Sequence, residues 1–237
     1  MKVMIVVTHL LGTGHLARAL TLGRAFIAGG HEVCVVSGGM PAPQLDRGDV
    51  PLLQLPPVRS NGVDFSRLLD DTGEEASSEL LAKRSALLVE HLNKKTPDVL
   101  ITELFPFGRR ILRAEFGTLL ESARSLPKPP LICASIRDIL APPSKPEKAV
   151  KADAIIAAFY DAVLVHADAD VTPLALSWPV SASLAPKLNY TGFVAPPPAA
   201  PTHQDVVQSP ATLTSSNAAP LTSRFGRALR PPTRFSP

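Results

Sequence analysis

A glycine-containing turn near the start of the sequence holds the residues best suited to chemistry. Gly12, Thr13, Gly14 and His15 stand directly before a segment with helical spacing. Small residues let the backbone turn sharply, and the free amides at the start of a helix attract anionic or polar ligand groups. Histidine can accept and release a proton near neutral pH. The turn therefore predicts a binding site with His15 as a general base; the alternative is a histidine that only caps or packs at a helix start.

A carboxylate follows a later apolar run and could act with this histidine. Glu103 comes directly after Asp98–Thr102, which has the composition of a buried strand. A carboxylate beside an imidazole can orient the ring and stabilise its protonated form, so Glu103 and His15 are predicted to form a catalytic pair. The alternative is an exposed acid in the first turn of a helix, where the helix dipole favours negative charge.

A second polar group lies at the end of the apolar run Leu131–Ser135. It consists of Ser135, Arg137 and Asp138, which are predicted to contact acceptor hydroxyls or a phosphate together with Gly12, Thr13 and Gly14. The alternative for Arg137 and Asp138 is an ordinary surface ion pair.

Two cofactor hypotheses are not supported by the sequence. Gly12, Gly14 and Ala17 match the weak form of a dinucleotide fingerprint, but the next apolar run ends at Ser37 without the acid that holds a ribose. The segment from His166 to Asp170 has a His-x-Asp-x-Asp pattern, yet this spacing at a strand end points its ligands poorly toward one ion. We therefore expect neither a metal ion nor a bound cofactor.

Apolar runs and amphipathic segments alternate along most of the chain. This pattern predicts an α/β fold with a doubly wound, mostly parallel, Rossmann-like sheet. The expected strands are Lys2–Thr8, Glu32–Ser37, Pro51–Leu55, Asp98–Thr102, Leu131–Ser135, Ala162–Val165 and Lys187–Thr191. The expected helices are Leu16–Ala28, Ser77–Asn93, Gly108–Ser125 and Glu147–Phe159. Because the carboxyl ends of parallel strands meet at one edge, His15, Glu103 and Ser135 are expected to lie close together.

The periodicity stops after Val194, which divides the chain into two parts. Residues 1–194 are predicted to form one domain, whereas residues 195–237 are rich in Pro, Ser, Thr and Arg and are predicted to be a disordered tail. The abrupt change suggests a truncation or a frameshift as the origin of the tail.

Charge and cysteine content narrow the function classes. The formal net charge is +3, and residues 199–237 hold all of that excess, with four arginines and one aspartate. A neutral body has no basic face for phosphate backbones, so nucleic-acid binding is not expected. No apolar run reaches the length of a membrane span. Cys34 and Cys133 are expected to be buried free thiols, which suits a reducing compartment. We expect a cytoplasmic protein and leave open a peripheral position at the inner face of the membrane.

The segment from His9 to Gly39, HLLGTGHLARALTLGRAFIAGGHEVCVVSGG, resembles the start of glycosyltransferase family 28 and its neighbours. These include the lipid-linked N-acetylglucosaminyltransferase of peptidoglycan synthesis, the plant-type and macrolide enzymes, and an uncharacterised bacterial branch of predicted glycosyltransferases. Tyr190-Thr191-Gly192-Phe193-Val194 is similar to the segment that closes the first domain in such enzymes. The resemblance implies the GT-B fold, in which an amino-terminal domain binds the acceptor and a second domain binds the nucleotide sugar.

For this chain the resemblance implies an amino-terminal, acceptor-side half. The family's chemistry transfers a sugar from a nucleoside diphosphate to an acceptor hydroxyl, such as that of a glycan, a lipid-linked or a small molecule. His15 matches the family's proton-accepting histidine, and Glu103 matches the acid that orients it. Residues 202–237 hold no glycine-rich donor motif. We therefore expect an inactive half that meets a nucleotide sugar only with a second domain or chain; the alternative is a non-catalytic Rossmann-like subunit that partners a separate donor chain.

Overall fold

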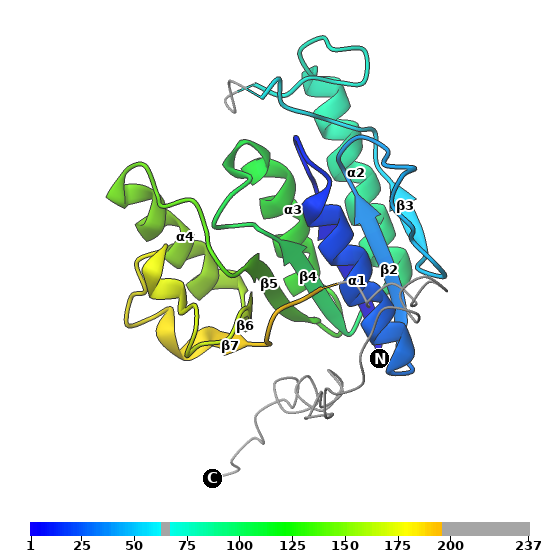
Figure 1. The fold of residues 1–237 in the computed structure, drawn as a ribbon. Coiled ribbons are helices and arrows are strands. Elements are labelled where there is room, and N and C mark those ends of the chain that lie inside the picture. Colours follow the sequence, from blue (N-terminus) through cyan, green and yellow to red (C-terminus); the bar gives the residue numbers. More distant parts are fainter. Residues whose placement is uncertain (63–66, 196–237) are drawn as a thin grey trace, which may run out of the picture.

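The computed structural model describes residues 1–62 and 67–195. Their framework is a parallel sheet of seven strands in the order β3-β2-β1-β4-β5-β6-β7 (Figure 1). The strands are β1 (Lys2–Val7), β2 (Glu32–Ser37), β3 (Leu52–Gln54), β4 (Val99–Glu103), β5 (Leu131–Arg137), β6 (Ala162–His166) and β7 (Leu188–Tyr190). The predicted α/β, doubly wound, Rossmann-like fold is confirmed.

Within the described residues, four α-helices cover the two faces of this sheet. They are α1 (Gly14–Ala28), α2 (Ser78–Lys95), α3 (Arg113–Arg124) and α4 (Pro146–Phe159), with short 3₁₀ helices η1 (Arg110–Leu112), η2 (Leu174–Leu176) and η3 (Ala185–Lys187). One apolar cluster joins the sheet to α1, and a larger one joins the opposite face to α2, α3 and α4. Figure 1 shows α1 in front of the sheet. Side chains that alternate along β4, β5 and β6 therefore face α1 or the other three helices.

The strand order reverses between β1 and β4. The chain runs outward from β1 to β2 and β3, then returns to place β4 on the other side of β1. Such a switch point leaves a crevice beyond the carboxyl ends of the two central strands, where α/β proteins bind ligands. The glycine turn follows β1 and Glu103 ends β4, so the fold places both at this crevice.

Several boundaries near the carboxyl edge differ from the predicted ones, including one helix start and two strand ends. The helix predicted from Gly108 begins at Arg113, because Leu104 and Arg109 take left-handed φ angles of 68° and 56° and the chain turns between them. Strand β5 continues to Arg137 and β6 to His166, because these two residues are paired in the parallel ladder. This extension brings His166 to the carboxyl edge.

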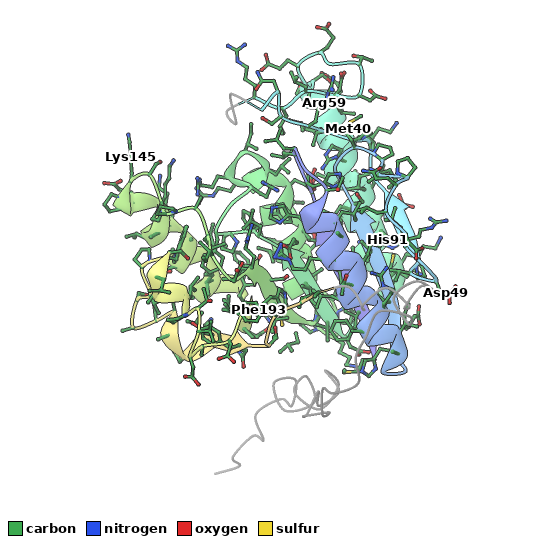
Figure 2. All side chains as sticks on the ribbon, viewed as in Figure 1. Met40, Asp49, Arg59, His91, Lys145 and Phe193 are labelled. Carbon is green, nitrogen blue, oxygen red and sulfur yellow. The ribbon has the colours of Figure 1, made fainter. Side chains whose placement is uncertain are left out.

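A long polar loop, described over residues 56–62 and 67–76, lies at the same edge as the glycine turn. The Ser60 amide donates to the Leu10 carbonyl over 2.8 Å, which ties the loop to the turn after β1. Bridges between Arg59 and Leu69 and between Leu69 and Glu75 fold the loop back on itself. Figure 2 shows Arg59 in this loop, beyond the ends of the strands.

Candidate active site

The glycine turn borders open space. Gly14 is the first residue of α1, and Thr13 precedes the helix without a side-chain cap. A Cβ atom added to Gly12 or to Gly14 would meet no atom within 4 Å. Packing within the described chain therefore does not require glycine at either position, and the exposed backbone is accessible to a ligand. The first turn of α1 also lacks an acidic residue that would occupy its amides.

His15 lies beside Glu103, as the sequence predicts. The Nδ1 atom of His15 is 3.0 Å from Oε1 of Glu103, although the two residues are 88 positions apart in the chain. An ionised carboxylate can only accept hydrogen bonds, so Nδ1 of His15 carries the proton and donates it. The lone pair of neutral His15 is then on Nε2. Glu103 is 1% exposed, whereas 23% of the His15 side chain is exposed. The exposed member of the pair is thus the one that can take a proton from a bound hydroxyl.

The Glu103 carboxylate is stabilised as an anion despite its burial. Burial acts to raise its pKa, but the hydrogen bonds from His15 and Ser135 and the charge of Arg18 outweigh it, so the pKa of Glu103 lies below its usual range. The Nε atom of Arg18 is 3.4 Å from Oε1 of Glu103. The alternative interpretation, an exposed acid at a helix start, does not fit a residue that ends a buried strand.

A series of hydrogen bonds runs from Glu103 through Ser135 to the residues at the end of β6 and after β7. The two residues are paired in the ladder between β4 and β5, and the Ser135 hydroxyl donates a short hydrogen bond to Oε2 of Glu103. The Ser135 oxygen is also 2.9 Å from Nε2 of His166, and Nδ1 of His166 is 2.8 Å from the Thr191 hydroxyl. Burial lowers the pKa of His166 to about 4, so this ring is neutral at pH 7. Polar side chains thus connect His15 to Thr191 across β4, β5 and β6.

A pocket of about 750 Å³ lies beside these residues on the α1 face. Its wall includes Gly14, Arg18, Arg137, Asp138, His166 and Phe193. Figure 2 shows Phe193 on the segment that follows β7 and passes in front of the sheet. The pocket is large enough for a sugar-sized or larger small molecule.

Arg137 and Asp138 form the ion pair that was the simpler alternative at the sequence level. Nε of Arg137 is 3.0 Å from Oδ1 of Asp138, and the Arg137 side chain is 56% exposed. Both residues nevertheless line the pocket. Their predicted contacts with an acceptor therefore remain a proposal, since a salt bridge this exposed costs little to open.

Ser135 has a different environment from the one predicted for it. Its side chain is fully buried, and its hydroxyl is bonded to Glu103 and His166 rather than presented to the pocket. Gly12 and Thr13 stand at the turn but are not among the residues that line the pocket, whereas Gly14 is. The sequence pattern predicts that all of these residues lie at one edge of the sheet. It does not predict which side chains are buried in the protein and which line the pocket.

Two contributors were not predicted from the sequence. In the sequence His166 stands out only as part of a metal-like pattern, and no motif marks Arg18. Among residues 1–62 and 67–195, no three His, Cys, Asp or Glu side chains are grouped so as to hold a metal ion. The position of His166 could have indicated its role, because it ends a strand next to β5 and its side chain points to the same face of the sheet as that of Ser135.

Sequence comparison and structural comparison give different results. No model of a protein family matches the sequence, and no curated protein matches it. Similar solved structures include the glycosyltransferase SsfS6 of a Streptomyces species, with 16% identity over 70% of this chain and 50% of that one, and a TM-score of 0.43. They also include MurG of Acinetobacter baumannii, with 14% identity over 82% and 46% and a TM-score of 0.46. A third is the UDP-N-acetylglucosamine 2-epimerase of Rickettsia bellii, with 14% identity over 81% and 45% and a TM-score of 0.44.

This chain spans about half the length of each of these proteins. Glycosyltransferases are the class that the opening motif resembles, and they are prominent among the structural neighbours. At identities this low the similarity concerns the fold. No helix within the described residues combines the length and the apolar character of a membrane span.

Proposed function

We propose that this chain is the acceptor-side part of a glycosyltransferase that uses a nucleoside-diphosphate sugar. The observation that carries the proposal is the contact between His15 and the buried anion Glu103 at the switch point of the sheet. Gly14 and Arg18, the neighbours of His15 on α1, line an open pocket, although His15 itself does not. A histidine held in this way can remove the proton from an acceptor hydroxyl while that oxygen attacks the anomeric carbon. Glu103 stabilises the imidazolium that results.

In this proposal the acceptor occupies the pocket on the α1 face. Gly14 supplies open backbone at the helix start, and Arg137 and Asp138 supply polar groups at the rim. Positioning the hydroxyl near His15 lowers the entropic part of the barrier. The diphosphate leaving group would be stabilised by a donor-binding domain or partner chain.

The proposal assigns the acceptor site to this chain and the donor site to another domain or chain, because this chain spans about half the length of the similar structures. We place the protein in the cytoplasm, where nucleotide sugars are available. The non-catalytic alternative, a binding subunit for a separate donor chain, predicts the same partner but no role for His15 in turnover.

Reconstitution tests this proposal. Residues 1–194 are combined with a donor domain, either fused through a repaired reading frame or supplied as the chain of a neighbouring gene, and release of nucleoside diphosphate is measured with a panel of sugar acceptors. Transfer is expected from the combination and not from either part alone. Transfer by the isolated chain, or binding of a nucleotide sugar to it with micromolar affinity, would contradict the proposed division.

A further inference from the structure

The hydrogen-bonded groups behind Glu103 have donors and acceptors that can be assigned one by one. Glu103 is an acceptor only, so the single proton of the Ser135 hydroxyl is donated to Oε2. The Ser135 oxygen must then accept from Nε2 of His166, which is 2.9 Å away. A neutral imidazole that donates from Nε2 accepts at Nδ1, so the Thr191 hydroxyl donates to His166 over 2.8 Å. The chain Thr191–His166–Ser135–Glu103–His15 therefore has one consistent direction of donation.

The fold holds this chain of groups in place. Glu103 and Ser135 are register partners, and His166 lies diagonally across from Ser135, because Ser135 is paired with Leu164. The Thr191 amide donates to the Val165 carbonyl over 3.0 Å, which fixes Thr191 beside the end of β6. Ser135, His166 and Thr191 are each less than 10% exposed. Water therefore competes little for these hydrogen bonds, and their directions are kept.

We infer that Ser135 and His166 are positioning residues that hold the Glu103 carboxylate in the orientation from which it fixes His15 with the proton on Nδ1. Any contribution of these residues to catalysis rests on the proposed function, but their effect on the tautomer of His15 does not. Ser135 occupies one carboxylate oxygen and leaves the other for His15. His166 supplies the donor that orients the Ser135 hydroxyl. Without this support the carboxylate can rotate, and both tautomers of His15 become available.

The test uses the chain itself, without any partner. The nitrogen chemical shifts of His15 are measured by NMR in ¹⁵N-labelled protein, at a pH where the ring is neutral, because they report which nitrogen carries the proton. Wild-type His15 is expected in the Nδ1–H form. Ser135→Ala and His166→Leu are expected to shift it to a mixture with a substantial Nε2–H fraction.

Two further variants distinguish loss of the Glu103 orientation from nonspecific disruption of the buried structure. Ser37→Ala makes the same change at another fully buried serine at the end of a strand, whose hydroxyl has no hydrogen-bond partner within the described residues, so the His15 tautomer should not change. His166→Gln keeps an amide donor near the place of Nε2 and should retain the Nδ1–H form. If Ser135→Ala fails to fold, the comparison of His166→Leu with His166→Gln gives the same information.

The outcomes separate this inference from the proposed function. An unchanged tautomer in folded Ser135→Ala and His166→Leu overturns the positioning role and leaves the proposed function to its own test. A tautomer shift supports the role even if no reconstituted enzyme is active. In an active reconstituted enzyme, Ser135→Ala should lower kcat about 10- to 100-fold with an unchanged KM for the nucleotide sugar. A change in KM alone would contradict the positioning role.

Discussion

At the scale of single residues, the proposed site depends on one buried charge. Glu103 lies beneath the crevice with three groups directed at it: the imidazole of His15, the hydroxyl of Ser135 and the guanidinium of Arg18. A carboxylate in this environment remains ionised at neutral pH, because its pKa is held below the usual range. In the proposed chemistry its role is electrostatic: it stabilises the imidazolium that forms when His15 takes the acceptor's proton, and it leaves Nε2 of the neutral ring free to accept that proton.

Removing this charge should slow transfer. In Glu103→Gln the neutral amide stabilises the imidazolium formed during proton transfer less than the carboxylate does, so the kcat of a reconstituted enzyme is expected to fall, by less than the loss of the base itself would cost. Glu121→Gln, an exposed substitution on α3, is the matched control and should leave kcat unchanged. An unchanged kcat in Glu103→Gln would be inconsistent with this electrostatic role.

His166 makes a separate prediction about stability. Burial lowers its pKa from 6.5 to about 4, so below pH 6.5 the unfolded chain binds a proton at this residue that the folded chain does not. The free energy of unfolding should therefore fall as the pH is lowered, with a contribution from His166 of about 2 kcal/mol between pH 7 and pH 5. Below about pH 4 this contribution levels off.

Urea unfolding of wild type and His166→Gln at several pH values measures this contribution. The other histidines with lowered pKa values, His9 and His91, titrate in both proteins, so the difference between the two curves isolates His166. The variant should lose less stability between pH 7 and pH 5 than wild type. Parallel curves would mean that His166 is protonated equally in the folded and unfolded states.

At the scale of elements, a buried ion pair holds the carboxyl edge together on the other face of the sheet. Arg84 of α2 is fully buried, and its Nε lies 2.9 Å from Oε2 of Glu115 in α3. Its guanidinium also donates to the carbonyl oxygens of Gly38, over 2.8 Å, and of Pro56. Arg84 thus connects two helices to the loop after β2 and to the start of the long polar loop.

Breaking this pair should be costly. Arg84→Met leaves Glu115 as an unpaired buried charge and removes a donor from the carbonyls of Gly38 and Pro56, so a loss of about 3–5 kcal/mol in the free energy of unfolding is expected in urea titrations. Arg124→Met removes a partner from the half-exposed pair with Asp161 and should cost about 1 kcal/mol or less. Adding Glu115→Leu to Arg84→Met should recover part of the loss. Equal losses for Arg84→Met and Arg124→Met would refute this assignment.

The elements themselves could be predicted from the sequence because their signals are local. The apolar run Leu131–Ser135 and the amphipathic segment Ser77–Asn93 identify a strand and a helix by composition and period, and both are present with small changes of length. The pairing of His15 with Glu103 also followed, since parallel strands bring their carboxyl ends to one edge. The roles of Arg18 and His166 did not follow. His166 matters because β6 extends to it with its side chain toward α1, and Arg18 matters because of the side of α1 that meets the strand ends.

At the scale of the whole molecule, the described residues form one seven-stranded sheet, with one face covered by α1 and the other by three helices. The predicted tail, residues 195–237, falls outside the described residues from position 196 onward. Cys34 and Cys133 are buried free thiols, as the apolar runs around them predict, and burial raises the pKa of the Cys133 thiol to about 12. They are therefore poor nucleophiles, and the proposed chemistry remains with His15 and Glu103.

Turnover of a reconstituted enzyme with His15→Ala tests most sharply whether His15 is the general base. Loss of a positioned general base should lower kcat by about 10²–10⁴-fold and leave the affinity for the nucleotide sugar nearly unchanged. His31→Ala is the matched control, since His31 directly precedes β2 at the opposite edge of the sheet, and it should retain normal turnover. If His15→Ala keeps near-normal kcat while lowering the stability of the fold, His15 is a structural residue and the proposed base is wrong.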